Sequence, residues 1–477
     1  MNNNSRTSAK PRTQPVTRMG MVARICVAVL AWIISTNLLA DDLTTPSSLA
    51  TRPGVDWPTF LGPTGDGKTT ETGLSTWKTA SPKVRWILPV GEGYSAPTII
   101  LGHCLLFDRV KDQVRCRCLH AETAKELWTF TYPSTYVDKY NYDGGPRASP
   151  VSDGKRVYLH GPEGMLHCLA LEDGRLLWKV DTFKEFGVVQ NFFGVGSSPL
   201  IDGSKLIVHV GGNPPGSENK PFEQLAPNGS CIVAFDTASG KKLYQCGNDL
   251  ASYASPQLVT LNGKKTGLVF ARDGLVAFDP EKGVELFRHS FRARMLESVN
   301  VSNCLVDQDR ILLSESYAAG STLLRYRNNT VETVWTAVPR RRDFGIAAHM
   351  NTPILVGKHV FGCTGRQPNE AEFRCIELDT GKVVWREQPR LGDYQAGRGT
   401  LTYADGCFLY LAEEGVLFLI KANAQRYEQI AIWDGRQSPK NGPPFPMLPE
   451  PSWAAPVLSH GLVYLRGHGK LVCLEVY

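Results

Sequence analysis

The sequence predicts an all-β fold: an eight-bladed β-propeller of four-stranded blades, closed into a ring by an N-terminal strand that completes the last blade. Three observations support this prediction. A strand–turn–strand motif ending on an aromatic residue recurs along the chain, a proline motif precedes each copy, and the last unit is one strand short. Repeats of about 40 to 50 residues with this strand content are typical of propellers.

The aromatic motif consists of a short apolar strand, an acidic turn with glycine, and a second strand that closes on an aromatic side chain. Its clearest copies are LALEDGRLLW, VAFDTASGKKLY, VAFDPEKGVELF and IELDTGKVVW, ending at Trp178, Tyr244, Phe287 and Trp385. Weaker copies end at Trp128 and Trp335. A large ring at one fixed position of each unit predicts a wedge between adjacent blades rather than a ligand contact.

The proline motif joins small residues, a proline, a turn and a β-rich run, as in SAPTIILGHCLLF and ASPVSDGKRVYLH. Its prolines are Pro97, Pro150, Pro199, Pro256, Pro353 and Pro456. Two further copies, near Val301 and Thr402, have another residue in place of the proline. The resulting eight units average about 51 residues, and each holds four strand-like runs, the content of one blade.

The eighth unit ends at Tyr477 after only three of these runs. The missing outer strand is available near the other end of the chain, where KVRWILPV carries Trp86 in the position of the closing aromatic. Pairing of this strand with the last blade would remove the open sheet edges. The propeller is therefore predicted to span residues 83–477, after a lead-in segment of residues 41–82.

Residues 1–40 are predicted to be a signal peptide. They contain five basic residues and no acidic residue, an apolar run from Ile25 to Ile34, and the sequence NLLA ending at Ala40 before two aspartates. The alternative is an uncleaved N-terminal anchor; once the segment is removed, no stable membrane span is expected. The mature protein is predicted to be periplasmic or secreted, and a monomer.

Nucleic acid and nucleotides are excluded as partners. The net charge of +6 falls to about +1 without residues 1–40, so the body has no basic field for a phosphate backbone. GPTGDGKT, from Gly62 to Thr69, matches the P-loop pattern. However, Pro58 interrupts the strand that should precede a P-loop, and the β-branched residues and Gly73 that follow are a poor helix start.

The aromatic motif, L-D-T-x-x-G-K-x-x-W, resembles the tryptophan docking repeat of the PQQ-like, or quinoprotein alcohol dehydrogenase-like, eight-bladed propellers. The stretch DWPTFLGPTGDG is similar to the opening W-P-x-F-x-G-P-x-x-D-G of exported bacterial members, particularly those of planctomycetes. The resemblance covers about Asp56 to Tyr477. It implies the fold; because the repeats specify how blades pack, it does not identify a site.

Three functions are compatible with this resemblance. The leading interpretation is a binding or scaffolding module without a recognisable catalytic site. The second is a PQQ-dependent oxidoreductase for small alcohols or sugars that uses PQQ with Ca²⁺ in a non-standard pocket. The alcohol-oxidising members typically hold the quinone against a disulfide of adjacent cysteines, but this sequence has no Cys-Cys pair and no C-x-x-C-H haem site. The third is a carbohydrate-binding propeller.

No catalytic or metal-binding residues are assigned, because the sequence contains no HExxH or other metal-ligand spacing and no G-x-S-x-G. Four cysteines share one position in the third strand of their units, which predicts a small buried apolar slot. They are Cys118, Cys168, Cys375 and Cys473. In an oxidising compartment, two pairs are candidate disulfides across a hairpin. These pairs are Cys231 with Cys246, and Cys363 with Cys375.

The loops from the outer strand of one blade to the inner strand of the next gather on one face of a propeller. Here they are long and rich in aromatic and charged residues, and binding sites favour loops on a rigid scaffold. A small-molecule, glycan or protein ligand is therefore expected on this long-loop face. The candidate residues are Tyr142, Arg147, Asn191, Glu297, His349, Asn351, Arg398 and Trp453. Arg147, His349 and Arg398 stand close to inner strands and are expected to point toward the channel mouth.

Overall fold

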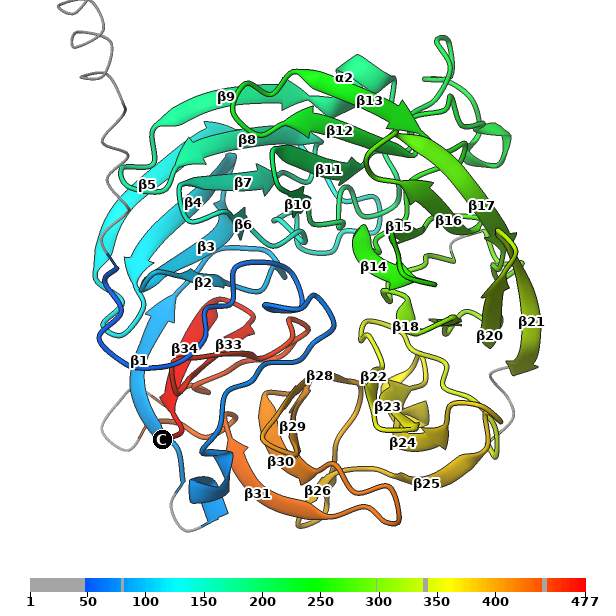
Figure 1. Ribbon diagram of the computed structural model, residues 1–477. Coiled ribbons are helices and arrows are strands. Elements are labelled where there is room, and N and C mark those ends of the chain that lie inside the picture. The colour runs from blue at the N-terminus through cyan, green and yellow to red at the C-terminus, as the bar shows by residue number, and fades with distance from the viewer. Residues whose placement is uncertain (1–47, 79–80, 297, 338–341, 440–443) are drawn as a thin grey trace, which may run out of the picture. The chain divides into compact units, whose positions relative to one another are not determined.

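The computed structural model describes residues 48–477 apart from 79–80, 297, 338–341 and 440–443. The residues from Ser48 onward form one unit. Within the described residues, eight four-stranded antiparallel sheets form the blades of a propeller (Figure 1). This confirms the predicted fold class. The predicted signal peptide, residues 1–40, lies outside the described residues.

The blades are numbered here in chain order, and the strands of each blade are given from the innermost outward. Blades 1 to 4 are β2 (Thr98–Ile100), β3 (His103–Val110), β4 (Gln113–His120) and β5 (Glu126–Pro133); β6 (Val151–Ser152), β7 (Arg156–His160), β8 (Met165–Ala170) and β9 (Leu176–Asp181); β10 (Leu200–Asp202), β11 (Lys205–His209), β12 (Ile232–Asp236) and β13 (Lys242–Cys246); and β14 (Gln257–Leu261), β15 (Lys264–Phe270), β16 (Gly274–Asp279) and β17 (Val284–Ser290).

Blades 5 to 8 follow the same order, and blade 8 takes its outer strand from the N-terminal side of the chain. They are β18 (Leu305–Asp307), β19 (Arg310–Glu315), β20 (Gly320–Arg327) and β21 (Thr330–Ala337); β22 (Ile354–Val356), β23 (His359–Thr364), β24 (Glu372–Glu377) and β25 (Val383–Glu387); β28 (Gly399–Ala404), β29 (Cys407–Ala412), β30 (Val416–Lys421) and β31 (Gln429–Asp434); and β32 (Val457–Ser459), β33 (Leu462–Gly467), β34 (Lys470–Glu475) and β1 (Lys83–Pro89).

Five short elements lie between the blade strands. They are η1 (Leu74–Lys78), α2 (Thr182–Phe186), η2 (Phe222–Gln224), η3 (Pro368–Glu370) and the hairpin of β26 (Arg390–Leu391) with β27 (Tyr394–Gln395). None of the helices that the structure describes is long and apolar enough to cross a bilayer.

The proline motif marks the start of the innermost strand. Pro97, Pro150 and Pro199 directly precede β2, β6 and β10, and the same holds for β14, β22 and β32. Figure 1 shows β10, β14, β18 and β22 lining the centre and β5, β9, β17 and β25 at the periphery. Because proline has no backbone N–H to donate, it suits the position where a strand begins.

The ring closes as the sequence predicts. β1 pairs antiparallel with β34, and Trp86 lies opposite Cys473 after a bulge. The same bulge places Trp128 opposite Cys118 and Trp178 opposite Cys168 in blades 1 and 2. Blade 8 therefore has the same strand order as the others, although its outer strand comes from the opposite end of the propeller sequence.

The closing aromatics dock each blade onto the next. Six indole or phenol groups each donate a hydrogen bond to a carbonyl just after the third strand of the following blade. In five of them the acceptor is the first residue after that strand, and for Trp385 it is the second. These bonds run from Trp86 to Ala121 (3.1 Å), Trp128 to Leu171 (2.8 Å), Trp178 to Thr237 (3.0 Å), Tyr244 to Pro280 (3.0 Å), Trp335 to Leu378 (2.9 Å) and Trp385 to Asn423 (2.9 Å).

Two junctions use other contacts. Phe287 has no polar group and stacks on Tyr326 of blade 5 at a ring-centroid distance of 5.0 Å. Blade 7 carries Ala431 at the equivalent position, opposite Leu419. Its inner strand instead donates from Thr402 Oγ1 to the carbonyl of Pro456 in blade 8, at 2.5 Å. Every neighbouring pair of blades is thus joined.

The core lies between blades. One buried cluster joins Leu105 and Cys118 of blade 1 to Val157 and Leu169 of blade 2, and similar clusters recur around the ring. The four cysteines at the shared strand position are fully buried, as the apolar-slot interpretation requires.

Neither candidate disulfide is formed, since all four thiols are free. In the first hairpin Ile232, rather than Cys231, lies opposite Cys246. In the second, Cys363 lies opposite Phe373, two residues before Cys375. Residues joined across a hairpin should lie directly opposite one another, and these registers are offset by one and two residues.

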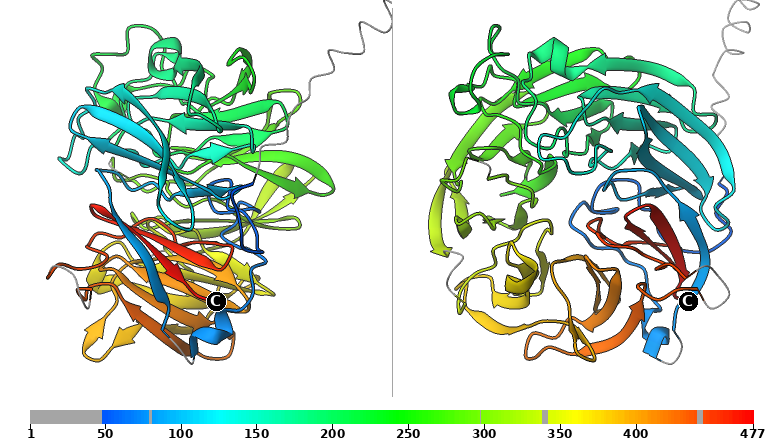
Figure 2. Two further views of the ribbon diagram at one scale, coloured as in Figure 1. Left: turned by 90° about the vertical axis from the view of Figure 1, so that its left-hand side faces the viewer. Right: turned by 180° about the vertical axis from the view of Figure 1, so that it is seen from behind.

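The lead-in segment runs inside the ring of inner strands, where Figures 1 and 2 show it in dark blue. Trp57 pairs with Ile99 of blade 1, the carbonyl of Pro58 accepts from Ser152 of blade 2 at 3.0 Å, and Lys68 pairs with Tyr403 of blade 7. GPTGDGKT therefore forms turns that connect distant blades. The short η1 follows it, and no P-loop helix is present in the described residues.

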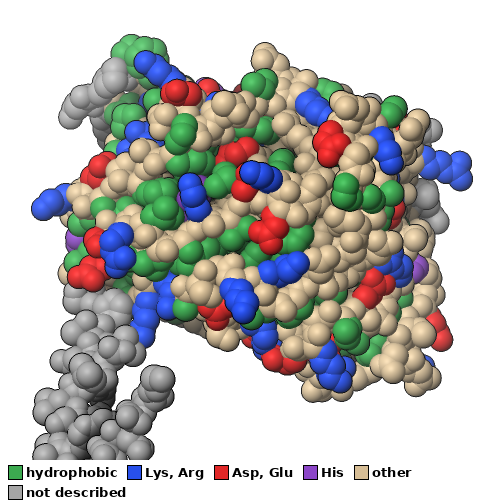
Figure 3. Space-filling view, turned by 90° about the horizontal axis from the view of Figure 1, so that it is seen from above, with side chains coloured by type: hydrophobic (Ala, Val, Ile, Leu, Met, Phe, Trp, Pro, Cys, Tyr) green, Lys and Arg blue, Asp and Glu red, His purple; other side chains and the backbone are tan. Residues whose placement is uncertain are grey.

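The outer surface carries mixed charge. Figure 3 shows Lys and Arg interspersed with Asp and Glu over one side of the propeller, with apolar side chains between them. This distribution agrees with a body of nearly neutral net charge.

The docking bonds allow a stability test. Trp128 is 9% exposed and donates to the Leu171 carbonyl. We expect Trp128→Phe to lower the free energy of unfolding by about 1 kcal/mol, because the carbonyl loses its donor, and Trp128→Ala to lower it by about 3–5 kcal/mol. Urea denaturation measures both. Leu127→Ala, at a neighbouring 39% exposed side chain, is the control and should change it by less than about 0.5 kcal/mol.

Candidate functional site

A belt of hydrogen bonds sets the position of the chain just before each inner strand. The backbone N–H of Ser149 donates to Ser198 Oγ of the next blade at 2.8 Å, and that of Ser198 donates to Ser255 Oγ at 2.9 Å. The pattern continues from Ser255 to Asn303 and from Asn303 to Thr352. Blades 2 to 6 therefore enter their inner strands in one register.

Two residues before this belt position, each blade contributes one residue to a single cavity. We call these residues the rim ring. They are Tyr94, Arg147, Gly196, Tyr253, Val301, Met350, Arg398 and Trp453. Where the anchor proline is present, the rim residue stands three positions before it. Gly196 is required because a Cβ there would lie 2.6 Å from the ring of Tyr253.

The cavity has a volume of about 250 Å³ and lies at the mouth of the channel on the long-loop side. Phe60 and Leu61 of the lead-in segment line its floor. A larger cavity of about 430 Å³ lies further along the channel, and Phe60 and Thr352 line both. The lead-in segment thus divides the channel into two compartments.

Six of the eight predicted site residues line the mouth cavity. They are Tyr142, Arg147, His349, Asn351, Arg398 and Trp453. Asn191 instead lines a separate cavity of about 30 Å³, where its amide donates to the Ala251 carbonyl at 3.2 Å. Glu297 lies outside the described residues. The side-chain amide of Asn351 donates to the Cys363 carbonyl and accepts from the Cys363 N–H, so its role is structural.

Arg398 is held by a buried carboxylate behind the cavity wall. Its Nε and Nη2 donate to Glu413, the latter at 2.6 Å, and Glu413 also accepts from Trp453 Nε1 at 2.9 Å. Glu413 is 2% exposed. A bidentate, charge-assisted pair fixes the plane of the guanidinium group, so both Arg398 and Trp453 have defined orientations.

His349 is neutral and has a defined tautomer. Arg398 Nη1 lies 3.3 Å from His349 Nδ1, and arginine can only donate, so Nδ1 is the acceptor. Nε2 therefore carries the proton and donates to the Tyr317 hydroxyl at 3.4 Å. Burial lowers the pKa of His349 to about 3, and the positive charges of Arg398 and Arg366 contribute to this decrease.

Arg147 stands before blade 2, three blades from Arg398 around the ring, and lies among aromatic rings. Its guanidinium carbon is 5.4 Å from the ring centroid of Tyr94 and 5.7 Å from that of Phe193. Nη2 donates to Asp138 at 2.9 Å, whereas Nη1 is buried and has no hydrogen-bond partner among the described residues. Burial raises the pKa of Tyr94 to about 12, so this phenol is neutral.

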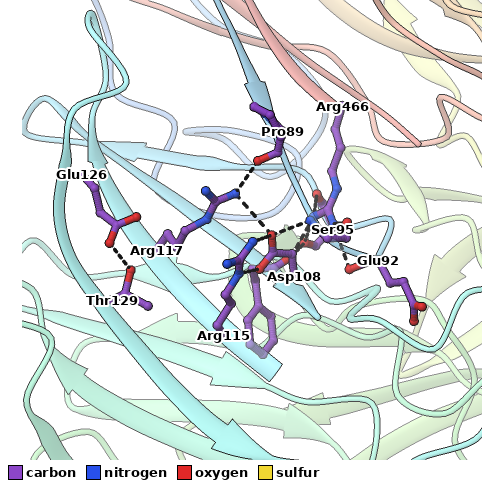
Figure 4. Close-up of polar contacts among 11 residues, drawn as sticks. Pro89, Glu92, Ser95, Asp108, Arg115, Arg117, Glu126, Thr129 and Arg466 are labelled. Carbon is purple, nitrogen blue, oxygen red and sulfur yellow. Dashed lines mark hydrogen bonds and ion pairs between the residues drawn. The ribbon is translucent and has the colours of Figure 1, made fainter. Parts of the chain in front are cut away.

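A buried polar cluster at the closure of the ring positions the loop that carries Tyr94 (Figure 4). Arg466 of blade 8 donates to the carbonyls of Ser95 at 2.9 Å and Phe107 at 2.7 Å. Asp108 accepts from Arg115 Nε at 2.6 Å and from the Gly91 N–H at 2.8 Å. These contacts hold the segment between β1 and β2.

That segment is in turn bonded to the loop of Arg147. Tyr94 N–H donates to the Pro146 carbonyl at 2.8 Å, and Gly93 N–H donates to Asp143 at 2.8 Å. The ring closure therefore determines how Tyr94 and Arg147 approach each other.

Sequence reasoning missed several lining residues, including Tyr94, Tyr253, Phe193 and Tyr317. A usable signal exists for two of them, because Tyr94 and Tyr253 stand three positions before Pro97 and Pro256, as Arg147 does before Pro150. Phe193 and Tyr317 lie outside that register, and only the path of their loops brings them to the cavity.

Comparison with known families agrees with this geometry. The family described as outer membrane protein assembly factor BamB matches residues 110–387 and 227–454. The chain belongs to this family. It is a PQQ-like, BamB-type propeller. A search of curated proteins finds no match.

Solved structures with the same fold share little sequence with this BamB-type propeller. BamB from Moraxella catarrhalis is 13% identical, with a TM-score of 0.52 over 83% of this chain and 98% of that one. Quinohemoprotein alcohol dehydrogenase from Comamonas testosteroni is 10% identical, with a TM-score of 0.58 over 88% and 80%. A similar enzyme from Pseudomonas putida HK5 is 9% identical. At these identities the likeness shows the fold alone.

The mouth cavity does not fit the quinone–calcium pair of the alcohol dehydrogenase alternative. No lining residue of the cavity is an aspartate or glutamate. Among the residues that the structure describes, no group of three His, Cys, Asp or Glu side chains is arranged to hold a metal ion. Divalent calcium requires several oxygen ligands, usually including carboxylates.

The tautomer of His349 can be measured. We expect the imidazole of His349 to remain neutral, protonated on Nε2, from pH 5 to 8, because its pKa is about 3. Long-range ¹H–¹⁵N correlation spectra of the protein report this state directly, and disappearance of the signal in His349→Gln assigns it. A signal assigned in this way that titrates near the ordinary histidine pKa of about 6.5 would contradict the proposed geometry.

The buried polar cluster around Asp108 and Arg466 predicts that the free energy of unfolding depends on pH. Burial alone would raise the pKa of Asp108, but the Arg115 and Gly91 hydrogen bonds and the two arginine charges lower it below its ordinary value. Asp108→Asn should lower the free energy of unfolding by about 3–5 kcal/mol at pH 7. An ionised carboxylate of lowered pKa stabilises the fold above the unfolded-state pKa of about 3.9 and stops doing so as pH falls through its folded value.

The difference between the wild type and Asp108→Asn should therefore narrow as pH falls below about 4. Thermal unfolding of both proteins from pH 7 to pH 3 measures it. A difference that stays constant over this range would show that the charge of Asp108 is not the cause.

Proposed function

We propose that this protein is an exported, BamB-type propeller that binds a small molecule in the mouth cavity on its long-loop face. The observation that carries the proposal is the cavity itself, to which every blade contributes one rim-ring residue and the lead-in segment contributes a floor. Concave sites with mostly apolar walls and a few convergent polar groups are the usual ligand sites of proteins.

The walls of the cavity combine rigidity with access. Tyr94 and Trp453 pack at a centroid distance of 4.7 Å, and Tyr142, which is 52% exposed, meets Trp453 edge-on at 6.3 Å. Hydrogen bonds behind the wall fix Arg398 and Trp453. A ligand entering past Tyr142 would therefore meet side chains that are already ordered, which lowers the entropic cost of binding.

A fragment screen by saturation-transfer NMR tests the proposal. The library contains neutral sugars, amino acids, aromatic acids and alcohols, and PQQ with and without Ca²⁺. We expect fragments that bind the wild type to bind at least about tenfold more weakly to Ala455→Phe, whose ring would occupy the cavity beside Trp453. Circular dichroism verifies that the variant is folded.

The matched control is Ala238→Phe, which adds the same side chain at an exposed turn between β12 and β13. The proposal is wrong if no fragment binds the wild type, or if Ala455→Phe and Ala238→Phe bind equally well. Calcium-dependent binding of PQQ would favour the oxidoreductase alternative, and selective binding of neutral sugars would favour the carbohydrate-binding alternative.

A further inference from the structure

We infer that the mouth cavity takes a small carboxylic acid built on a flat, apolar ring, an inference that rests on the proposed function and names its ligand class. The starting point is a set of donors without acceptors. Arg147 Nη1 and Ser149 Oγ both line or border the cavity, both are buried, and neither has a partner among the described residues. Leaving a buried donor unpaired costs about 1–3 kcal/mol, and more when it is charged.

Ser149 is unpaired because the belt is interrupted beside it. In blades 3 to 6 the belt side chain accepts from the backbone N–H of the preceding blade. Ser149 would need that bond from the Ala96 N–H, and no bond from Ala96 occurs among the described residues. Its hydroxyl is left without a partner two residues from Arg147, and both residues line the cavity.

Tyr317 supplies a third donor. Its hydroxyl accepts the Nε2 proton of His349, and among the described residues no acceptor takes its own proton. His349 cannot act as that acceptor, because its other nitrogen already accepts from Arg398. Tyr317 lines the mouth cavity, so the proton is available to a ligand there.

The acidic partners of the cavity lie behind its arginines. Asp138 holds Arg147 through Nη2, and Glu413 holds Arg398 through Nε and Nη2. Neither acid lines the cavity. The wall therefore presents the positive ends of two ion pairs together with hydroxyl donors. A carboxylate can accept several such bonds at once, and charge-assisted bonds are about twice as strong as neutral ones.

The remaining lining selects the body of the ligand. Tyr94, Trp453, Phe193 and Tyr253 form aromatic walls, and Phe60 and Leu61 form the floor. Such surfaces favour a flat, apolar partner. A cavity of about 250 Å³ suits one ring with a short acidic group rather than a polymer.

Equilibrium binding of four probes tests the inference. Isothermal titration of the wild type with benzoate, benzamide, benzyl alcohol and glucuronate should give at least about tenfold tighter binding for benzoate than for each of the others. Benzamide has nearly the shape of benzoate without its charge, and glucuronate keeps the charge without the flat ring. Equal binding of benzoate and benzamide, tighter binding of glucuronate, or no benzoate binding up to 20-fold molar excess at millimolar protein would overturn the inference.

Two variants locate the carboxylate. Arg147→Met should weaken benzoate binding at least about tenfold and leave benzamide binding nearly unchanged, while Arg175→Met, at a 67% exposed side chain, should affect neither. Because Arg147→Met strands Asp138 and could unfold the loop, Ser149→Ala is a second, milder variant, for which we expect a severalfold loss of benzoate only. Benzoate binding that resists both variants would place the acid elsewhere.

The outcomes separate this inference from the proposed function. If fragments bind the wild type and are lost in Ala455→Phe, but acids show no advantage over their neutral analogues, the binding function stands and the ligand class is wrong. If Ala455→Phe binds the fragments as well as the wild type does, both the proposed function and the inferred ligand class are wrong.

Discussion

The pairing of β1 with β34 is the constraint on which the rest of the structure depends. It gives blade 8 its outer strand and leaves no open edge at β34. The chain on both sides of β1 is then fixed as well. Before β1, Arg52 is bonded to Glu475 at 2.6 Å, and Glu71 accepts from the N–H of His460 at 2.9 Å. After β1, Arg466 and Asp108 hold the segment that leads to Tyr94.

The repeat that builds the scaffold also builds the cavity. Each blade docks on the next through an aromatic side chain, and a belt of hydrogen bonds joins the starts of the inner strands. Together these contacts place the same backbone position of every blade at the channel mouth. The side chain at that position takes no part in the aromatic docking bonds, so different residue types can stand there. Glycine, valine and methionine stand there in three blades, and arginine, tyrosine or tryptophan in the other five. We therefore expect specificity to depend on these eight positions, which differ from blade to blade on a frame that repeats in every blade.

The sequence predicted the frame better than the site. Strand order, the proline before each inner strand and the role of Trp86 follow from local patterns that recur in every unit, so eight copies reinforce one interpretation. Arg147, Arg398 and Trp453 were found because they belong to the long loops. Phe60 was missed because the lead-in segment has no repeat, and its course across the channel depends on contacts with distant blades such as the Lys68–Tyr403 pairing. The two predicted disulfides are not formed because the cysteines of each pair are offset by one or two residues across their hairpins. The sequence of the turn does not by itself determine that register.

The unpartnered Arg147 Nη1 differs from an ordinary packing defect because neighbouring side chains hold the guanidinium group in place. A guanidinium group that is merely badly packed would rotate until Nη1 reached water or a carbonyl. Arg147 cannot do so, because Tyr94 and Phe193 flank it and Asp138 anchors Nη2. Asp138 itself is fixed by the N–H groups of Tyr140 and Tyr142, at 2.9 and 3.3 Å. The same loop therefore stabilises the cation and denies Nη1 an acceptor, so a ligand acceptor that reaches Nη1 would form a bond that no group of the wall supplies.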